Sequence, residues 1–309
     1  MVTEPLNDSG SSSSNFYWLE SVNEKVERVR FQKDLNHSGF DSTNSNTENL
    51  VWSLDNDSLL LSFLRSCKFY GDSTYEKVIK AYKFREKNAK YFADLNPHIE
   101  RNVFEKNVFA VLPYRDNYGR RTIIIEAGKK WNPKTVSLLE FVRGVVTIIE
   151  AAQLEPKTQI AGVNIIIDVD GLTLSHVWQF SPNFAKFLLE FLQEALPLRI
   201  KSVHVVNQPY LFNMLYAIFK PFILEKLRER IFFHGSDMSS LTEHIDPKCL
   251  PTQYGGILEL ETIYGEAFVE LICCFQDKID GNFSSFMYIS VNINFIYFIF
   301  NQSLHKLLN

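Results

Sequence analysis

Cysteine is scarce in this 309-residue chain, and the four that occur show neither the pairing pattern of a disulfide framework nor metal-ligand spacing. An apolar signal-peptide stretch after Met1 is missing as well. These two absences predict a reducing, cytoplasmic setting. The formal net charge of −4 excludes the strongly basic composition of a broad nucleic-acid binder, so we predict no nucleic-acid partner.

The common catalytic motifs are also absent, because no G-x-G-x-x-G, Walker loop, G-x-S-x-G or H-E-x-x-H occurs. The seven histidines are scattered, and none lies at metal-ligand spacing with a second donor. His204, within an apolar stretch, is interpreted as a hydrogen-bonded core residue. We therefore predict no catalytic residue, no metal site and no cofactor.

One enzymatic alternative comes from an apolar run that ends in Asp168 and Asp170. Aspartate-nucleophile phosphatases use such a pair, in which one carboxylate attacks phosphorus and both gather around Mg²⁺. Leu172 stands where those enzymes place Thr or Val, and no later acidic pair or strand-end lysine completes the site. A structural role, in which the aspartates end a buried strand and cap the next turn, is the preferred interpretation.

The composition changes along the chain. Ser, Asn, Asp and Thr dominate residues 1–56, which predicts a flexible segment with one possible helix near 18–31. From Asp57 onward apolar residues recur at helical spacing, and Ser73 with Glu76 forms a capping-box pattern for a second helix. Residues 57–100 are therefore predicted to form a small all-helical domain.

Short apolar runs with turn residues between them begin near residue 108. Residues 108–112 and 122–125 are predicted strands around a turn, and 163–167 and 203–206 are predicted buried strands. Amphipathic helices lie between them, one of which starts at Ser181 and Pro182. Strands apolar on both faces belong in a sheet that helices cover. The predicted fold class is α/β, with a mostly parallel sheet flanked by helices after a small all-helical domain.

Residues 262–309 differ from the rest, since they are rich in Phe, Ile, Asn and Tyr without a clear period. The run 286–300 contains Asn292 and Asn294 and is shorter than the roughly 20 apolar residues that a membrane span needs. An atypical hydrophobic tail of unknown role is therefore favoured over a tail anchor.

Four basic residues could converge on one point. Arg199 and Lys201 are two apart at the start of a predicted strand, so they share a face. Lys226 and Arg230 are four apart on a predicted helix and also share a face. A phosphorylated head group could bind between them, but Glu225 and Glu229 could equally neutralise a solvated helix. Spacing alone leaves these two interpretations even.

Several short motifs occur in one order between residues 57 and 260. They are Phe63-Leu64-Arg65, Tyr118-Gly119-Arg120, Ile167-Asp168, the segment 203–209, Phe219-Lys220-Pro221-Phe222, the segment 230–235, Leu250-Pro251 and Tyr254-Gly255-Gly256. In these motifs the sequence resembles the CRAL-TRIO family of lipid-binding proteins, in the sub-group of the alpha-tocopherol transfer protein, the retinaldehyde-binding protein and the clavesins. The resemblance implies a lipid-binding domain over 101–261 that holds one hydrophobic ligand.

The resemblance also implies site residues. Positions that match family pocket residues are Val142, Val145, Ile149, Leu172, Leu188, Phe191, Leu192, Leu196 and Val203. A lid over 207–230 would carry Phe212, Leu215, Ile218 and Phe219. Arg65, Arg199, Lys201, Lys226 and Arg230 match basic positions that bind phosphoinositides. Leu172 replaces a tryptophan of the tocopherol carrier, while Val145 and Ile149 replace small polar residues, which puts tocopherol itself in doubt.

The function that the resemblance implies is that of a monomeric, non-enzymatic lipid carrier. It would bind one retinoid-, tocopherol- or phospholipid-like ligand in the cytoplasm and dock reversibly on endosomal or other membranes that carry phosphoinositides. The alternative is a membrane-trafficking adaptor that uses the same pocket and the same basic residues. A Mg²⁺-dependent phosphatase is the most distant alternative.

Overall fold

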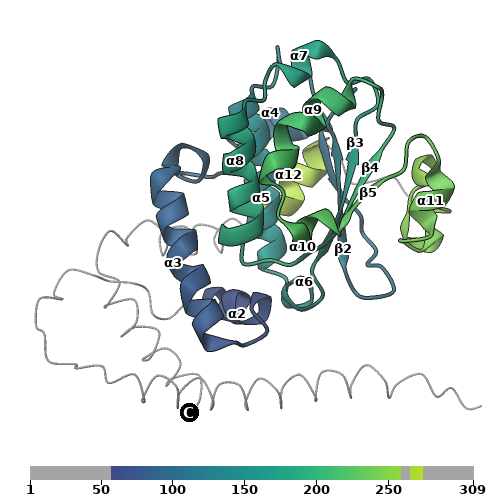
Figure 1. Cartoon of the computed structure of the whole chain (residues 1–309). Helices are drawn as coiled ribbons and strands as arrows, with labels where there is room; N and C mark the ends of the chain where they lie inside the picture. The colour runs from purple at the N-terminus through teal and green to yellow at the C-terminus, as the bar shows by residue number, and fades with distance from the viewer. Residues whose placement is uncertain (1–56, 259–264, 274–309) are drawn as a thin grey trace, which may run out of the picture.

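The structure is a computed structural model that describes residues 57–258 and 265–273 (Figure 1). The predicted flexible segment 1–56 lies outside the described residues, as does most of the predicted tail 262–309. No helix in the described part of the chain is long and apolar enough to cross a membrane.

Helices lead the described chain: α2 (Asp57–Ser66), α3 (Gly71–Lys87), the 3₁₀ turn η1 (Ala89–Tyr91) and α4 (Arg101–Glu105). Helix α2 lies where apolar residues recur at helical spacing from Asp57 onward, but the predicted capping box of the second helix is wrong. Lys68 and Phe69 both adopt positive φ (54° and 62°), and this tight turn lets α3 begin at Gly71. Ser73 and Glu76 therefore lie within the helix.

Five strands form one sheet in the order β1-β2-β3-β4-β5: β1 (Phe109–Val111), β2 (Arg121–Glu126), β3 (Val163–Asp168), β4 (Ile200–Val206) and β5 (Ile231–Phe233). Only β1 runs antiparallel to its neighbour, and β2 to β5 pair in parallel. This sheet, with its flanking helices and its helical leader, confirms the predicted fold class.

The remaining helices follow the strands in the α/β manner. They are α5 (Leu138–Gln153), α6 (Pro156–Ala161), α7 (Leu174–Val177), α8 (Pro182–Glu190), the π-helical turn η2 (Phe191–Ala195), α9 (Phe212–Phe219), η3 (Lys220–Phe222), α10 (Glu225–Arg228), α11 (Met238–Thr242), η4 (Pro247–Cys249), η5 (Thr252–Tyr254) and α12 (Gly265–Cys273). The Ser181 hydroxyl caps α8, with Pro182 in its first turn, as the sequence predicted. Helix α12 packs on α4 through buried Val269 and Ile272.

The sheet separates two apolar layers, because alternate residues of each strand point to opposite faces. Ile124, Ile166 and Val206 pack on the side of α11, together with Leu250 and Tyr254. Ile123, Ile165 and Val203 face the other side, where α5, α8 and α9 lie (Figure 1).

The leading helices are joined to this second layer by buried contacts. Arg85 of α3 forms an ion pair with Glu150 of α5, and both side chains are buried. The Phe84 ring stacks on Phe187 of α8 with centroids 5.4 Å apart. These contacts hold α3 against α5 and α8, the helices that face the sheet.

Candidate functional site

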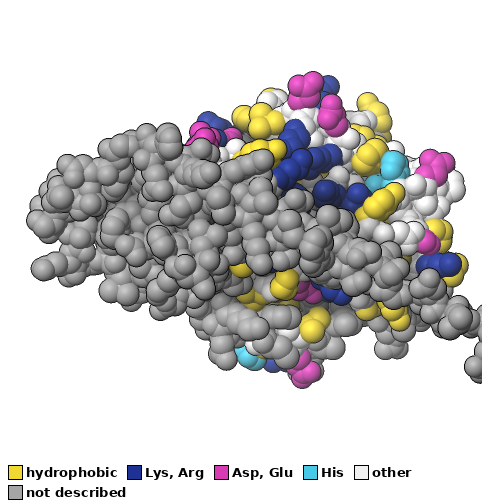
Figure 2. Space-filling view, turned by 90° about the horizontal axis from the view of Figure 1, so that it is seen from below, with side chains coloured by type: hydrophobic (Ala, Val, Ile, Leu, Met, Phe, Trp, Pro, Cys, Tyr) yellow, Lys and Arg dark blue, Asp and Glu magenta, His cyan; other side chains and the backbone are white. Residues whose placement is uncertain are grey.

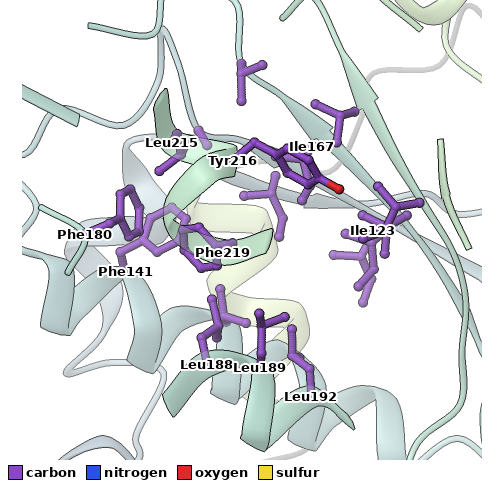
Figure 3. Close-up of a pocket in the computed structure, with 18 of the residues that line it drawn as sticks. Ile123, Phe141, Ile167, Phe180, Leu188, Leu189, Leu192, Leu215, Tyr216 and Phe219 are labelled. Atoms are coloured by element: carbon purple, nitrogen blue, oxygen red, sulfur yellow. The ribbon is translucent and has the colours of Figure 1, made fainter. Parts of the chain in front are cut away.

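An apolar cavity of about 240 Å³ lies between the sheet and the helices α5, α8 and α9 (Figure 3). Its floor is formed by alternate residues of four parallel strands: Ile123 and Ile125, Ile165 and Ile167, Val203 and Val205, Ile231 and Phe233. Phe141, Val142, Val145, Ile148 and Ile149 of α5 form one wall, and Phe184, Leu188, Leu189 and Leu192 form another. A space lined in this way favours an apolar occupant.

Seven of the nine predicted pocket residues line this cavity. They are Val142, Val145, Ile149, Leu172, Leu188, Leu192 and Val203. Four of them come from α5 and α8 and Leu192 from η2, and these helices lie across the cavity from the strands.

Phe191 and Leu196 lie elsewhere, both 1% exposed in the core. The Phe191 ring packs on Phe84 and Phe92 of the leading helical region, at centroid distances of 5.8 and 5.2 Å. The physical reason is helical spacing: Leu188 and Leu192 share the face toward the cavity, whereas Phe187 and Phe191, also four residues apart, share the face toward Phe84 of α3. Leu196 follows the turn η2 with extended backbone.

Helix α9 covers the cavity, and none of its residues is fully buried. Phe212, Leu215 and Phe219 of the predicted lid line the cavity together with Tyr216. Ile218 is not among the lining residues and packs instead on the cluster of Val169, Leu172, Val177 and Val205. The Phe219 ring contacts Phe180 edge to face at 5.6 Å, so an aromatic pair joins the lid to the segment before α8.

Sequence reasoning missed most of the cavity floor. Ile123, Ile125, Ile165 and Ile167 lie in strands that were predicted, and their alternation along each strand was the signal that places them on one face. Tyr216 and Phe233 were missed as well, because their positions depend on how α9 and β5 pack.

Asp168 serves the structure at the end of β3. Its Oδ1 accepts hydrogen bonds from the Asp170 backbone N–H (3.0 Å) and the Asn207 amide (3.1 Å), and its Oδ2 accepts one from the Tyr254 hydroxyl (3.2 Å). Asp170 forms an ion pair with Lys129. In the described residues no three His, Cys, Asp or Glu side chains are placed to hold a metal ion. These bonds fit the predicted capping role for Asp168, while Asp170 pairs with a lysine.

His204 lies on the face of the sheet away from the cavity and is fully buried. Hydrogen bonds join its Nδ1 to His234 Nε2 (2.9 Å) and its Nε2 to the Ser202 hydroxyl (2.8 Å). Burial, followed by the neighbouring His234 and His244, lowers the pKa of His204 to about 3. It is thus a neutral, hydrogen-bonded core histidine.

Four of the five predicted basic residues, Arg65, Arg199, Lys201 and Arg230, lie near the first residues of β4. Arg199 Nη2 donates to the carbonyls of Gln159 and Ile160 at the end of α6, and Arg65 Nη1 donates to Gln159 Oε1 (2.5 Å). Arg230 Nη1 donates to the Ile200 carbonyl. Carbonyl and amide oxygens thus orient three guanidinium groups from three separate elements.

The pKa values of two lysines reflect the positive electrostatic potential of this region. Burial lowers the pKa of Lys201, and the charges of Arg199, Arg120, Arg230 and Lys68 lower it further. Burial also lowers the pKa of Lys77 of α3, where Cys67 opposes the shift and Lys226 adds to it. Because like charges repel, neighbouring cations add to the effect of burial on the pKa of both lysines.

We call this region the basic face; its residues are Arg65, Lys68, Lys77, Arg120, Arg199, Lys201, Lys226 and Arg230. Figure 2, seen from the end of the molecule where α2 and α10 lie, shows Lys and Arg side chains gathered together. Among the described residues, no carboxylate lies within 4.0 Å of the charged nitrogens of Lys201, Lys226 or Arg230. Glu225 and Glu229 therefore do not form the local ion pairs that would neutralise α10.

Comparison with known proteins agrees with this geometry. The family model of the CRAL/TRIO domain matches residues 105–256, which include the whole sheet and the helices around the cavity. Residues 105–256 belong to the CRAL/TRIO family.

Curated CRAL/TRIO relatives match beyond the domain alone. The human alpha-tocopherol transfer protein-like protein is 36% identical over 215 residues, which are 69% of this chain and 62% of the relative. Clavesin-2 of Mus musculus is 32% identical over 206 residues, 65% of this chain and 62% of the relative. The matched part thus spans less than two thirds of these relatives. The crystal structure of Sfh5 shares the fold, with a TM-score of 0.50 and 17% identity over 84% of this chain and 97% of that one.

Proposed function

We propose that this protein is a carrier that binds one hydrophobic molecule in the cavity and releases it at membranes containing anionic phosphoinositides. The observation that supports this most is the cavity itself, since apolar side chains from strands, two walls and a lid surround a single space. A retinoid-, tocopherol- or phospholipid-like ligand would bind there without a covalent step. The names of the tocopherol-transfer-like and clavesin relatives are consistent with this proposal.

The expected affinity suits a carrier. At about 0.3 kcal/mol per heavy atom, a ligand of about 30 atoms gains roughly 9 kcal/mol, which corresponds to a sub-micromolar Kd. Such a complex is stable during diffusion and still dissociates when the lid opens at a membrane.

The basic face supports the docking part of the proposal. Lys201, Lys226 and Arg230 have no carboxylate partner among the described residues, and a phosphorylated head group would supply the missing negative charge. At about 1 kcal/mol for each basic residue near an anionic surface, these three supply roughly 3 kcal/mol. Docking of this strength is reversible.

A vesicle transfer assay tests the proposal. Donor vesicles carry retinol, α-tocopherol or a fluorescent phosphatidylcholine, and acceptor vesicles are made with or without phosphatidylinositol bisphosphate. We expect the protein to accelerate transfer of at least one probe, and more strongly toward the phosphoinositide acceptors. Vesicle binding without transfer of any probe would instead support a trafficking adaptor, and the carrier proposal would be wrong.

A further inference from the structure

Gln159 joins two arginines of the basic face, although Gln159 itself is only 2% exposed. It lies in α6, which packs beside α2 (Figure 1). Its side-chain Oε1 accepts a hydrogen bond from Arg65 Nη1 (2.5 Å), and its backbone carbonyl accepts one from Arg199 Nη2 (3.3 Å). The Ile160 carbonyl accepts a second bond from the same nitrogen of Arg199. One residue thus contacts the guanidinium groups of α2 and of the residue before β4.

The orientation of the Gln159 amide is fixed at both of its polar atoms. Its Nε2 donates to the Gln153 backbone carbonyl at the end of α5 (2.6 Å), while its Oε1 faces Arg65. Turning the amide over would place its N–H groups against those of Arg65 and would remove both hydrogen bonds. The side chain therefore presents an acceptor, and not a donor, to Arg65.

The backbone holds Arg199 against the same helix. Gly162, directly after α6, has a φ of 87°, and a Cβ at this position would clash with the Arg199 carbonyl oxygen. The Val163 N–H donates a hydrogen bond to that same oxygen (2.9 Å). A residue other than glycine would therefore push Arg199 away from the end of α6. The glycine keeps Arg199 beside the carbonyls of Gln159 and Ile160.

The oxygens that Gln159 offers to the two arginines are neutral. Elsewhere in the described chain a carboxylate plays this part, as where Glu155 forms an ion pair with Arg121. A carboxylate orients a guanidinium but also cancels its charge, whereas an amide or carbonyl oxygen orients it and leaves the positive charge in place. Gln159 therefore fixes the direction of Arg65 and Arg199 without weakening their attraction for an anion.

We propose that Gln159 is a positioning residue of the basic face, which orients Arg65 and Arg199 so that both bind the phosphates of one membrane phosphoinositide. This inference rests on the proposed docking function and assigns to it a residue that touches no lipid itself. A guanidinium that is already oriented loses less side-chain freedom when it binds phosphate. Orientation matters most for a head group with phosphates at fixed positions, and least for a diffuse anionic surface.

The test uses the whole chain and two kinds of vesicle with equal surface charge, one containing phosphatidylinositol 4,5-bisphosphate and the other phosphatidylserine. Gln159→Met keeps an unbranched side chain of similar length but removes the oxygen that accepts from Arg65. We expect its Kd for the phosphoinositide vesicles to rise about fivefold, as the loss of one hydrogen bond implies. Its Kd for the phosphatidylserine vesicles should stay unchanged, because the charge of the basic face is unchanged.

The matched control is Gln153→Met, which removes another buried amide but keeps the backbone carbonyl that Gln159 contacts. Neither polar atom of the Gln153 side chain has a hydrogen-bond partner among the described residues, so this variant should change neither Kd. In an Arg65→Ala background, Gln159→Met should have no further effect, because its side chain acts through Arg65. Gln159→Glu still accepts from Arg65 but cancels one positive charge, so it should weaken binding to both kinds of vesicle.

The outcomes separate this inference from the docking proposal. A loss in Gln159→Met that is confined to phosphoinositide vesicles supports the inference. If wild type prefers those vesicles and Gln159→Met binds both kinds as wild type does, or weakens both equally, the inference is wrong and the docking proposal stands. If Gln159→Met does not fold, Gln159→Glu decides, and unchanged binding by that variant overturns the inference. If wild type shows no preference for phosphoinositide vesicles, the docking proposal and the inference are both wrong.

Discussion

Replacing Lys226 and Arg230 together by alanine should weaken binding to phosphoinositide vesicles without unfolding the protein. Both residues belong to the basic face, and neither has a carboxylate partner within 4.0 Å among the described residues. Near an anionic surface each cation contributes about 1 kcal/mol, so the pair should contribute about 2 kcal/mol. That corresponds to a vesicle Kd roughly thirty times higher.

The effect on stability should be small by comparison. Lys226 is exposed and alanine is a strong helix former, while Arg230→Ala removes one hydrogen bond to the Ile200 carbonyl, a loss of about 1 kcal/mol. Thermal unfolding should therefore remain cooperative, and loading of the cavity in solution should be nearly unchanged.

Vesicle cosedimentation at several salt concentrations is the assay. The matched control is Lys130→Ala with Lys134→Ala, which removes the same charge at two exposed positions outside the basic face. Replacing Arg199 and Lys201 together by alanine should weaken vesicle binding about as much as replacing Lys226 and Arg230. If all four residues contact one head group, the quadruple variant should lose less binding free energy than the sum of the two double variants. The reasoning is refuted if the Lys226 and Arg230 variant binds as wild type does, or no worse than the control.

Three further predictions concern the cavity, the lid and the buried histidines. Leu192→Asp should abolish lipid loading, measured by lipid extraction, because it places a charge in the cavity lining. Phe191→Ala should leave loading of the folded protein intact but lower the free energy of unfolding by about 3–5 kcal/mol, measured by chemical denaturation. Amides of residues 212–222 should exchange faster in delipidated than in loaded protein, and equal exchange in hydrogen-exchange mass spectrometry would exclude a gate there. The pKa of His204 is 6.5 in the unfolded chain and about 3 in the fold, so the unfolded chain binds the proton more readily. The free energy of unfolding should therefore decrease by about 1 kcal/mol per pH unit as pH falls from 6.5 toward 3. His204→Gln should reduce that slope in thermal unfolding between pH 6.5 and about 4.5, and an unchanged slope would contradict this role of His204.

Much of the fold follows from local sequence signals. The helix that begins at Ser181 and Pro182 was predictable because a hydroxyl cap and a first-turn proline act within a few residues. The buried strands β3 and β4 were predictable because both of their faces are covered, which requires apolar residues at nearly every position. The start of α3 was not, since it depends on the positive φ of Lys68 and Phe69, two residues that rarely adopt such a conformation.

The site was less predictable than the fold because it depends on how elements pack. Family resemblance placed Phe191 in the pocket with Leu188, but Phe191 lies on the face of the helix that carries Phe187 and packs on Phe84 and Phe92. The helix has two apolar faces, and only its packing shows which of them meets α3 and which meets the cavity. Tyr216 was missed for a similar reason, since its position depends on the contact of α9 with Phe233. Five of the eight residues of the basic face were named from the sequence, but Lys68, Lys77 and Arg120 were not, because their place beside the others depends on how the leading helices and the sheet pack.

The central claim is that one hydrophobic molecule occupies the space between the sheet and α9. Native mass spectrometry of the purified protein, after incubation with vesicles of a total cellular lipid extract, tests it most directly. The account predicts a one-to-one complex with a hydrophobic lipid that is lost on denaturation and is not formed by the Leu192→Asp variant. A wild-type spectrum that contains the bare chain alone would contradict it.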